Sequence, residues 1–209
     1  QYLGEEKLAS VGASSSVQFL VLGFCMGICC GFAIPISQHF GAKNTLKMKE
    51  AIFHAGFLSI LFAAVITTAC AILCPNILHI LSTPENIFDD AYSYLFIIFL
   101  GIPFTILYNF LSGLLRAVGD SKTPFLFLVF SSILNIILDL TFIIVFKLGV
   151  SGAALATIMS QGVSGLLCLI YIIKKFPILC ISKEHCRIKS DMTKQMIAMG
   201  VPMGLQYSI

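Results

Sequence analysis

Residues 123–146 read TPFLFLVFSSILNIILDLTFIIVF, and this stretch decides the class of fold. Its only charged residue is Asp139. The hydrocarbon core of a membrane is about 30 Å thick and is crossed by about 20 apolar residues in a helix, so the stretch is long enough to span it. Four further stretches are similarly long and carry no acidic or basic residue other than histidine: about 13–38, 51–74, 91–115 and 150–173. Another apolar pattern starts near residue 195 and is still running at residue 209.

The composition leaves too few charged residues for a water-exposed surface. Hydrophobic residues make up 58% of the 209 residues and charged residues only 11%, whereas soluble domains carry about 25% charged residues. This excludes a cytosolic enzyme, a nucleic-acid-binding protein and a disordered chain. We predict an all-α fold, a polytopic bundle of transmembrane helices surrounded by the lipid bilayer. Because the chain begins at Gln1 and ends at Ile209 inside an apolar stretch, we expect a fragment whose partner is the remainder of its own chain.

The basic residues are concentrated in alternate connectors. Connectors 39–50, 116–122 and 174–194 hold 11 of the 13 Lys and Arg residues, and the other two are Lys7 and Lys147. Since cytoplasmic loops of membrane proteins are enriched in Lys and Arg, we predict that these three loops are cytoplasmic. The protein is then a multi-pass protein of the cytoplasmic (inner) cell membrane. The first of the five spans enters from outside, so an odd number of spans, most simply one, is expected before it.

The one long cytoplasmic connector indicates a division of the chain. We predict one bundle over 1–173, a basic linker over 174–194 and the truncated start of a second bundle over 195–209. The alternative is that 174–194 is a surface loop within a single bundle. Its basic residues are not interleaved with aromatic side chains in the manner of single-strand nucleic-acid sites. We therefore interpret them as topology determinants and expect no nucleic-acid partner.

Asp139 is the most informative residue of the spans. A carboxylate in the hydrocarbon region costs at least about 2.5–3.5 kcal/mol, so its presence predicts a partner, a water-filled cavity or a bound proton. Asn135 lies four residues earlier, one helical turn away on a similar face. If residues 149–152 form a tight turn, Thr157 on the returning helix lies at the depth of Asp139, and Gln161 continues the polar stripe.

A carboxylate, a carboxamide and a hydroxyl at one level suit a small hard cation such as Na⁺. Protonation is a second way to occupy the site, because burial disfavours the charged form of a carboxyl group. We therefore expect a Na⁺ or H⁺ site at Asp139, Asn135 and Thr157, and no other metal site. The alternative is that a protonated Asp139 only forms a hydrogen bond between helices.

Other polar residues of the spans are less decisive. Tyr108 and Asn109 are adjacent in the third span and face either a substrate cavity or another helix. The same alternatives apply to Gln18 and to Gln161. His54 lies near the cytoplasmic end of the second span, which favours an interfacial residue over a proton relay.

Small residues and prolines indicate close helix packing and bends. Three glycines repeat at four-residue spacing in the first span: Gly23, Gly27 and Gly31. Glycines at this spacing let a second helix approach closely. We interpret them as a packing surface, which in a moving bundle would also be a sliding surface. Pro35 and Pro103 remove backbone hydrogen bonds and permit bends or hinges in their helices.

Two patterns that suggest chemistry are better explained by packing. The eight cysteines lie mostly in apolar stretches without zinc-type spacing, so we interpret them as small hydrophobic residues. Residues 162–165 (GVSG) match the GxSG pattern of intramembrane serine proteases, but residues 149–152 repeat it in an expected turn. A serine nucleophile also needs a base, and no histidine lies in the middle of a span. We expect no enzyme activity and no cofactor.

Several segments together resemble the multidrug and toxic compound extrusion (MATE) family. Residues 113–124 (GLLRAVGDSKTP) look like the loop between its spans four and five. Four other segments are similar to the family: 8–12 (LASVG), 38–42 (QHFGA), 135–139 (NIILD) and 152–157 (GAALAT). The resemblance covers roughly residues 4–173, and residues 200–206 (GVPMGLQ) look like the start of the family's seventh span.

The resemblance implies a MATE/MOP-type fold of twelve helices in two bundles of six, of which this chain would hold an N-terminal lobe lacking its first helix. It also implies an antiporter that exports drugs and other organic, mostly cationic or amphipathic compounds by alternating access, in exchange for Na⁺ or H⁺. In the DinF-like prokaryotic branch the first bundle holds the cation site. Asn135, Asp139 and Thr157 match its positions on spans five and six, and a further carboxylate of that branch lies on span one.

Two other functions remain open. A flippase for lipid-linked saccharides from the same superfamily would need inward-facing Arg or Lys side chains to bind phosphate. No basic residue lies inside a predicted span, which favours a cationic or neutral substrate. A passive channel or an assembly subunit is the alternative of another class.

Overall fold

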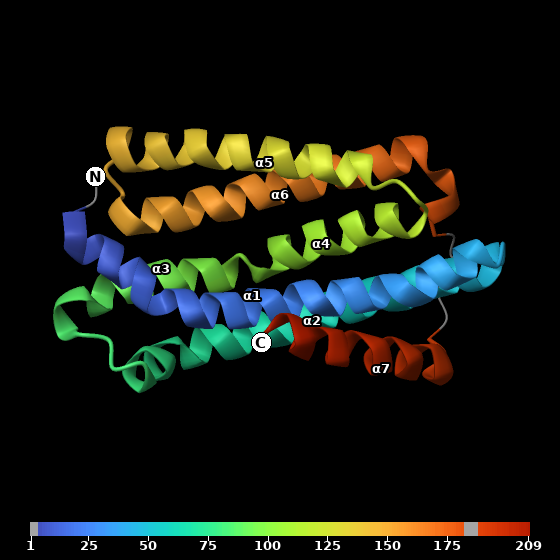
Figure 1. Cartoon of the computed structure of the whole chain (residues 1–209), viewed down its shortest axis with the longest axis horizontal. Helices are drawn as coiled ribbons and strands as arrows, with labels where there is room; N and C mark the ends of the chain where they lie inside the picture. The colour runs from blue at the N-terminus through green and yellow to red at the C-terminus, as the bar shows by residue number, and fades with distance from the viewer. Residues whose placement is uncertain (1–3, 182–187) are drawn as a thin grey trace.

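The structure is a computed structural model that describes residues 4–181 and 188–209. Over these residues it is built from helices and contains no strand, which confirms the predicted all-α class. Figure 1 shows the long helices lying side by side in an elongated bundle. In chain order the elements are α1 (Gly4–Gly41), α2 (Thr45–Ile80), α3 (Glu85–Leu100), α4 (Ile102–Ala117), α5 (Lys122–Leu140), the π-helix η1 (Thr141–Val145), α6 (Gly149–Lys175), the 3₁₀-helix η2 (Pro177–Leu179) and α7 (Ser190–Tyr207).

The bundle has the dimensions and the surface of a membrane protein. Within the described part of the chain, four helical segments are long and apolar enough to cross a membrane, and there are five if the bent pair α3–α4 is counted as one span. Phe32 and Phe99 are fully buried between the helices, whereas Ile60 and Val129 are exposed on the outside. An apolar outer surface requires a lipid environment, so the chain is a multi-pass membrane protein.

The third predicted span, 91–115, consists of two helices. α3 and α4 are bent by 42° at Gly101, which lies between them. Pro103, in the first turn of α4, has no N–H with which to continue the helix. Ile158 of α6 packs where a Cβ of residue 101 would lie. Any residue larger than glycine at this position would therefore require Ile158 to move. The sequence indicated the proline but not the role of Gly101.

The turn between α5 and α6 lies earlier in the chain than predicted. α5 continues into η1, and the chain reverses over 146–148, where Lys147 has a φ of 54°. Residues 149–152, which we predicted as a tight turn, form the first turn of α6 instead. Gly152 is there for close packing, since a Cβ on it would lie 3.0 Å from the Cβ of Phe142. The prediction was wrong because glycine permits close approach as well as turns.

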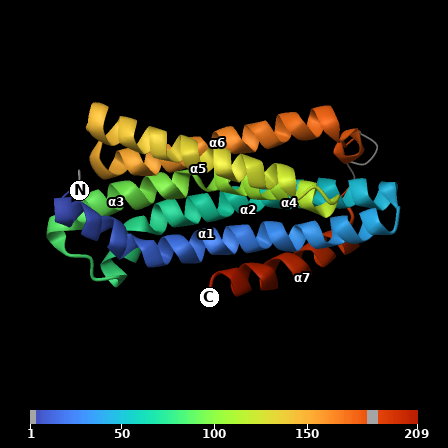
Figure 2. The ribbon, with the colours of Figure 1, turned by 45° about the horizontal axis from the view of Figure 1, so that its top comes forward.

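α7 packs along the second half of α1, as Figures 1 and 2 both show. The glycine stripe of α1 lies in this contact. A Cβ on each glycine would overlap the α7 backbone, at the pairs Gly23–Tyr207, Gly27–Met203 and Gly31–Gly200. In return, a Cβ on Gly200 or Gly204 would overlap the rings of Phe32 and Phe24. The two helices therefore touch through backbone and ring surfaces, and Pro35 is buried further along α1.

His54 fastens the start of α7 to α2. Its Nδ1 lies 2.7 Å from the Glu50 carbonyl oxygen, and its Nε2 accepts the Lys189 N–H at 2.8 Å. The Lys189 ammonium also forms an ion pair with the Glu50 carboxylate at 2.6 Å. His54 is only 1% exposed. His54 is therefore buried between α2 and the residue just before α7, and its position at the membrane interface stays a prediction.

The predicted linker, 174–194, has tighter bounds in the structure. α6 continues to Lys175, η2 follows, and α7 already begins at Ser190. Lys183 and Arg187 of the linker lie outside the described residues, as does the side chain of Lys7. That this segment joins two lobes stays a prediction.

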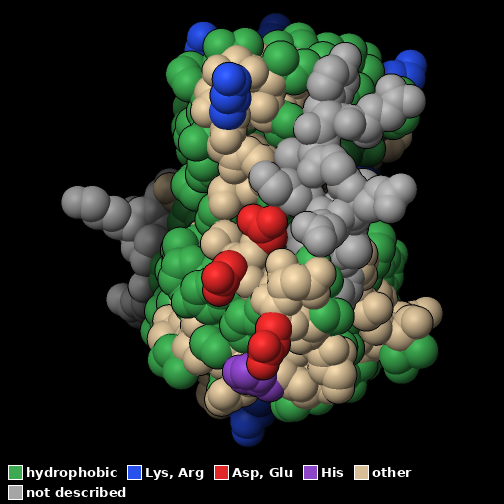
Figure 3. All heavy atoms as spheres, turned by 90° about the vertical axis from the view of Figure 1, so that its left-hand side faces the viewer, with side chains coloured by type: hydrophobic (Ala, Val, Ile, Leu, Met, Phe, Trp, Pro, Cys, Tyr) green, Lys and Arg blue, Asp and Glu red, His purple; other side chains and the backbone are tan. Residues whose placement is uncertain are grey.

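The two ends of the bundle differ in charge. Figure 3 shows acidic side chains together on the end where α2 connects to α3. The acidic residues of this connection are Glu85, Asp89 and Asp90, and it carries no Lys or Arg. The α1–α2 and α4–α5 connections, with their basic residues, lie at the opposite end in Figure 1. Their cytoplasmic location stays a prediction from this asymmetry.

Candidate functional site

A cavity of about 880 Å³ opens between α1, α4, α5 and α6, and the end of α7 contributes to its wall. The structure places Gln18, Tyr108, Asn109 and Gln161 in the lining. The Tyr108 hydroxyl donates to the Pro124 carbonyl at 3.1 Å, which holds the ring towards α5. Since ligand sites usually measure about 300–1,000 Å³, the cavity fits an organic molecule of drug size.

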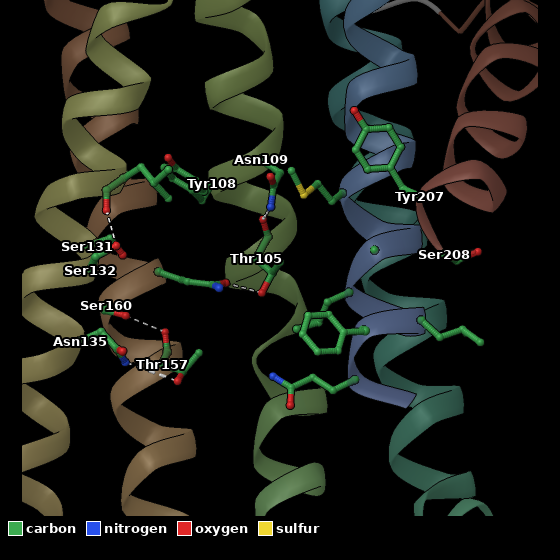
Figure 4. A pocket seen from close by; sticks show the side chains of 18 of the residues that line it. Thr105, Tyr108, Asn109, Ser131, Ser132, Asn135, Thr157, Ser160, Tyr207 and Ser208 are labelled. Atoms are coloured by element: carbon green, nitrogen blue, oxygen red, sulfur yellow. Dashed lines mark hydrogen bonds between the residues drawn. The ribbon is translucent and has the colours of Figure 1, made fainter. Parts of the chain in front are cut away.

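Thr105 organises the α4 side of the cavity, and sequence analysis missed it. Its hydroxyl donates to Oε1 of Gln161 on α6 and lies 3.4 Å from the Gly101 carbonyl oxygen. Asn109 Nδ2 donates to the Thr105 carbonyl at 2.8 Å, as Figure 4 shows. The spacing could have revealed Thr105, because it lies one helical turn before Asn109 on the same face of α4.

Asn135 and Thr157 meet across the α5–α6 interface although they are 22 residues apart. Asn135 Nδ2 donates to the Thr157 hydroxyl oxygen at 3.4 Å, and that hydroxyl donates to the Ala153 carbonyl at 3.0 Å. Both side chains also line the cavity (Figure 4). The amide oxygen of Asn135 and the remaining lone pair of Thr157 are therefore available to a further ligand.

Asp139 lies one turn beyond Asn135 on α5, and its side chain is half-buried. Its Oδ1 is buried and has no hydrogen-bond partner in the described part of the chain. Asp139 is not in the cavity lining, so it lies outside the wall that Asn135 and Thr157 help to form. Within residues 4–181 and 188–209, no three His, Cys, Asp or Glu side chains form a metal-binding group.

Tyr94 of α3 is the second residue that sequence analysis missed. Its hydroxyl donates to Gln18 Oε1 at 3.2 Å, and Gln18 lines the cavity. No motif marked Tyr94, because its role depends on how α3 packs against α1.

Arg116 is the only basic residue among the described residues that line the cavity. It lies in the last turn of α4, just beyond the span predicted to end at residue 115. Side chains of a helix point back towards its N-terminus, which directs the guanidinium towards the cavity. None of the described lining residues is Asp or Glu. Arg116 therefore reaches the cavity from just outside the predicted span, although no basic residue lies inside the span itself.

The apolar helices of the bundle enclose an open polar cavity, and a lone carboxylate lies within one of the predicted spans. The sequence model of the MatE family matches residues 1–141, and the chain belongs to this family. The predicted family is thus confirmed.

Relatives of the chain include proteins described as multidrug resistance and multidrug export proteins. The chain is 37% identical over 210 residues to the "Probable multidrug resistance protein YpnP" of Bacillus subtilis (strain 168), a match that covers 99% of the chain and 46% of that protein. It is 28% identical over 181 residues to the "Multidrug export protein MepA" of Staphylococcus aureus (strain NCTC 8325 / PS 47), covering 87% of the chain and 40% of that protein. The chain spans about half the length of the curated relatives it matches.

Solved structures show the same arrangement. A multidrug resistance MATE family transporter of the MOP superfamily in its inward-facing conformation matches with a TM-score of 0.92 and 26% identity, covering 98% of this chain and 47% of that one. An outward-facing conformation matches with a TM-score of 0.91 and 26% identity, covering 98% and 46%.

Proposed function

We propose that the protein containing this chain is a secondary antiporter of the cytoplasmic (inner) membrane. It exports organic, cationic or amphipathic compounds by alternating access, in exchange for Na⁺ or H⁺ bound at Asp139. Two relatives described as a multidrug resistance protein and a multidrug export protein support the export of drugs. The cavity of about 880 Å³ supports binding of an organic molecule within the bundle.

The unbonded carboxylate oxygen of Asp139 carries the proposal of cation coupling. A charge held within a span costs at least about 2.5–3.5 kcal/mol, and a bound cation or proton removes this cost. A bound proton would turn the unbonded carboxylate oxygen of Asp139 from a hydrogen-bond acceptor into a donor. Na⁺ would be held by the carboxylate with the oxygens of Asn135 and Thr157, since hard cations prefer oxygen ligands.

A single coupled charge is enough to bias access. One positive charge that crosses a potential of about 100 mV gains about 2.3 kcal/mol, which shifts a two-state equilibrium about fiftyfold. Cation entry from outside then stabilises the state that releases substrate outward. The antiporter thus needs only one site of this kind in each cycle.

Transport in vesicles tests the proposal. The product of the complete reading frame is reconstituted, and export of a fluorescent organic cation is driven by an imposed Na⁺ or proton gradient. We expect Asp139→Asn to abolish export while membrane insertion stays normal, because the variant has no charge for the cation to neutralise. Asp89→Asn, at an exposed residue of the acidic end, is the matched control and should export normally. Unchanged export in Asp139→Asn would remove Asp139 from the mechanism.

Arg116 supports a second candidate, a flippase for lipid-linked saccharides. The one basic residue of the described cavity lining would bind a phosphate group, and no carboxylate opposes it there. A MOP superfamily transporter from Pyrococcus furiosus, 26% identical with a TM-score of 0.91, is described as having a binding pocket of reverse polarity that suggests a different function. Binding of a lipid pyrophosphate that is lost in Arg116→Gln would favour the flippase. An ionophore that abolishes accumulation would exclude a passive channel.

A further inference from the structure

Two acceptors compete for one proton at the break between α3 and α4. The Thr105 hydroxyl donates to Oε1 of Gln161 and also lies 3.4 Å from the Gly101 carbonyl oxygen. A threonine hydroxyl has a single proton, so it serves one acceptor at a time. The Gly101 carbonyl already accepts the N–H groups of Phe104 and Thr105, at 3.0 and 3.1 Å. The hydroxyl is therefore free to choose Gln161 without leaving a buried carbonyl unpaired.

The choice of acceptor affects the bend. A threonine hydroxyl that bonds the carbonyl four residues earlier tends to bend its helix, and here that carbonyl lies at the 42° bend. Gln161 lines the cavity, so a substrate with a hydrogen-bonding group competes with Thr105 for its carboxamide. When Gln161 turns to the substrate, the Thr105 proton returns to the Gly101 carbonyl and stabilises the bent form.

The same turn of α6 also reaches the candidate cation site. Thr157 precedes Gln161 by four residues, hence one helical turn, and accepts the hydrogen bond from Asn135. Between them, Ile158 fills the notch that Gly101 leaves in the α3–α4 pair. A small rotation of this one turn therefore changes its contacts with α5, with the break and with the cavity together.

We propose that the α6 turn over residues 157–161 is the coupling element between cation and substrate, with Thr105 as its positioning residue. Occupation of Asp139 moves the Thr105 hydroxyl between Gln161 and the Gly101 carbonyl. This changes both the α3–α4 bend and the carboxamide presented to the substrate. The inference rests on the proposed function, and it assigns the substrate a hydrogen-bonding group that Gln161 recognises.

Backbone hydrogen exchange over residues 97–106 tests the coupling element. It is measured on the product of the complete reading frame in lipid nanodiscs, as wild type and as Asp139→Asn, which mimics a neutralised carboxylate. We expect Asp139→Asn to change the exchange rate at the break by at least about fivefold, the lower end of the usual range for coupled sites. The change should be lost in Thr105→Val and in Gln161→Leu, and kept in Thr105→Ser, which retains the hydroxyl.

Two matched substitutions serve as controls. Thr68→Val and Gln38→Leu remove the same groups at exposed residues outside the cavity lining, so both should keep the response to Asp139→Asn. The proposal would be overturned if Asp139→Asn changed the exchange rate fully in the Gln161→Leu background, or not at all in the wild-type background. If Thr105→Val does not fold, Gln161→Leu alone decides. If the reconstituted protein transports nothing but shows these exchange changes, the antiporter proposal is contradicted and the coupling element is retained.

Discussion

His54 has its tautomer fixed by its two neighbours. The Glu50 carbonyl oxygen only accepts, so Nδ1 carries the proton that it donates. The Lys189 N–H only donates, so Nε2 is without a proton. The ring is therefore neutral and joins α2 to the residue just before α7. The Glu50–Lys189 ion pair supports the same junction from the surface.

Removing this ring should loosen the start of α7. His54→Ala leaves the part-buried Lys189 N–H without its acceptor, which costs about 1–3 kcal/mol and corresponds to a rise in local opening of about 5–150-fold. The measurement is backbone hydrogen exchange over residues 190–196. His79→Ala, at an exposed histidine of α2, is the control and should leave that segment unchanged. Equal exchange in both variants would contradict the role given to His54.

Asp120 should stabilise the α4–α5 connection in a pH-dependent way. Burial alone would raise its pKa, but hydrogen bonds from Thr123, the Lys122 backbone and Tyr171 together hold the pKa below its usual value. A lowered pKa in the folded state means that the stabilisation is present above the unfolded pKa of about 3.9 and is lost as the pH falls through the folded value. Asp120→Ala should therefore lower the melting temperature at neutral pH, and the difference from wild type should vanish in acid.

The expected effect of Asp120→Ala is small. A helix cap is worth about 0.5–2 kcal/mol, and the low end applies to a carboxylate close to water. Ser121→Ala is the matched control, because Ser121 precedes α5 but makes no side-chain capping bond, whereas Asp120 accepts the Thr123 N–H at 3.0 Å. An equal loss in both variants, or a loss that persists in acid, would contradict this assignment.

Sequence patterns predicted the candidate site residues that short spacings connect. Asn135 was placed one turn from Asp139, and Thr157 was placed opposite from the length of the hairpin, although the turn itself was misplaced. Thr105 and Tyr94 were missed because their partners, Gln161 and Gln18, lie on distant helices. Contacts of this kind depend on helix rotation, which no local pattern determines.

At the scale of the helices, the α1–α7 contact should tolerate no added atom. A Cβ on Gly27 would overlap the Met203 carbonyl oxygen and the Gly204 backbone, and overpacking of this kind costs about 1–3 kcal/mol. Gly27→Ala should therefore lower the melting temperature of the purified protein. Gly12→Ala lies on the same helix with open space around its Cβ position, so it should be neutral or slightly stabilising. A stable Gly27→Ala protein would show that the two helices pack less closely.

The number of crossings was predictable from apolar length alone, because the membrane fixes how many residues a helix needs. The ends and breaks of the helices were not. Gly101 and Gly152 look alike in the sequence, yet the first separates α3 from α4 and the second packs within α6. Which role a glycine takes depends on the side chain opposite it, here Ile158 or Phe142.

At the scale of the whole molecule, the chain matches inward-facing and outward-facing MATE structures almost equally, with TM-scores of 0.92 and 0.91. The arrangement of these helices is therefore close to that found in both conformations of those transporters. Of the features at this scale, the difference in charge between the two ends of the bundle was the easiest to predict from the sequence.

The backbone contact between Gly31 and Gly200 joins segments that leave the ribosome far apart in time. At about 5–20 residues per second, α7 emerges roughly 10–30 s after the middle of α1. During that interval the glycine-lined face of α1 lacks α7, the helix that covers it in the folded bundle. Any other helix that packs there first has to be displaced before the native contact forms.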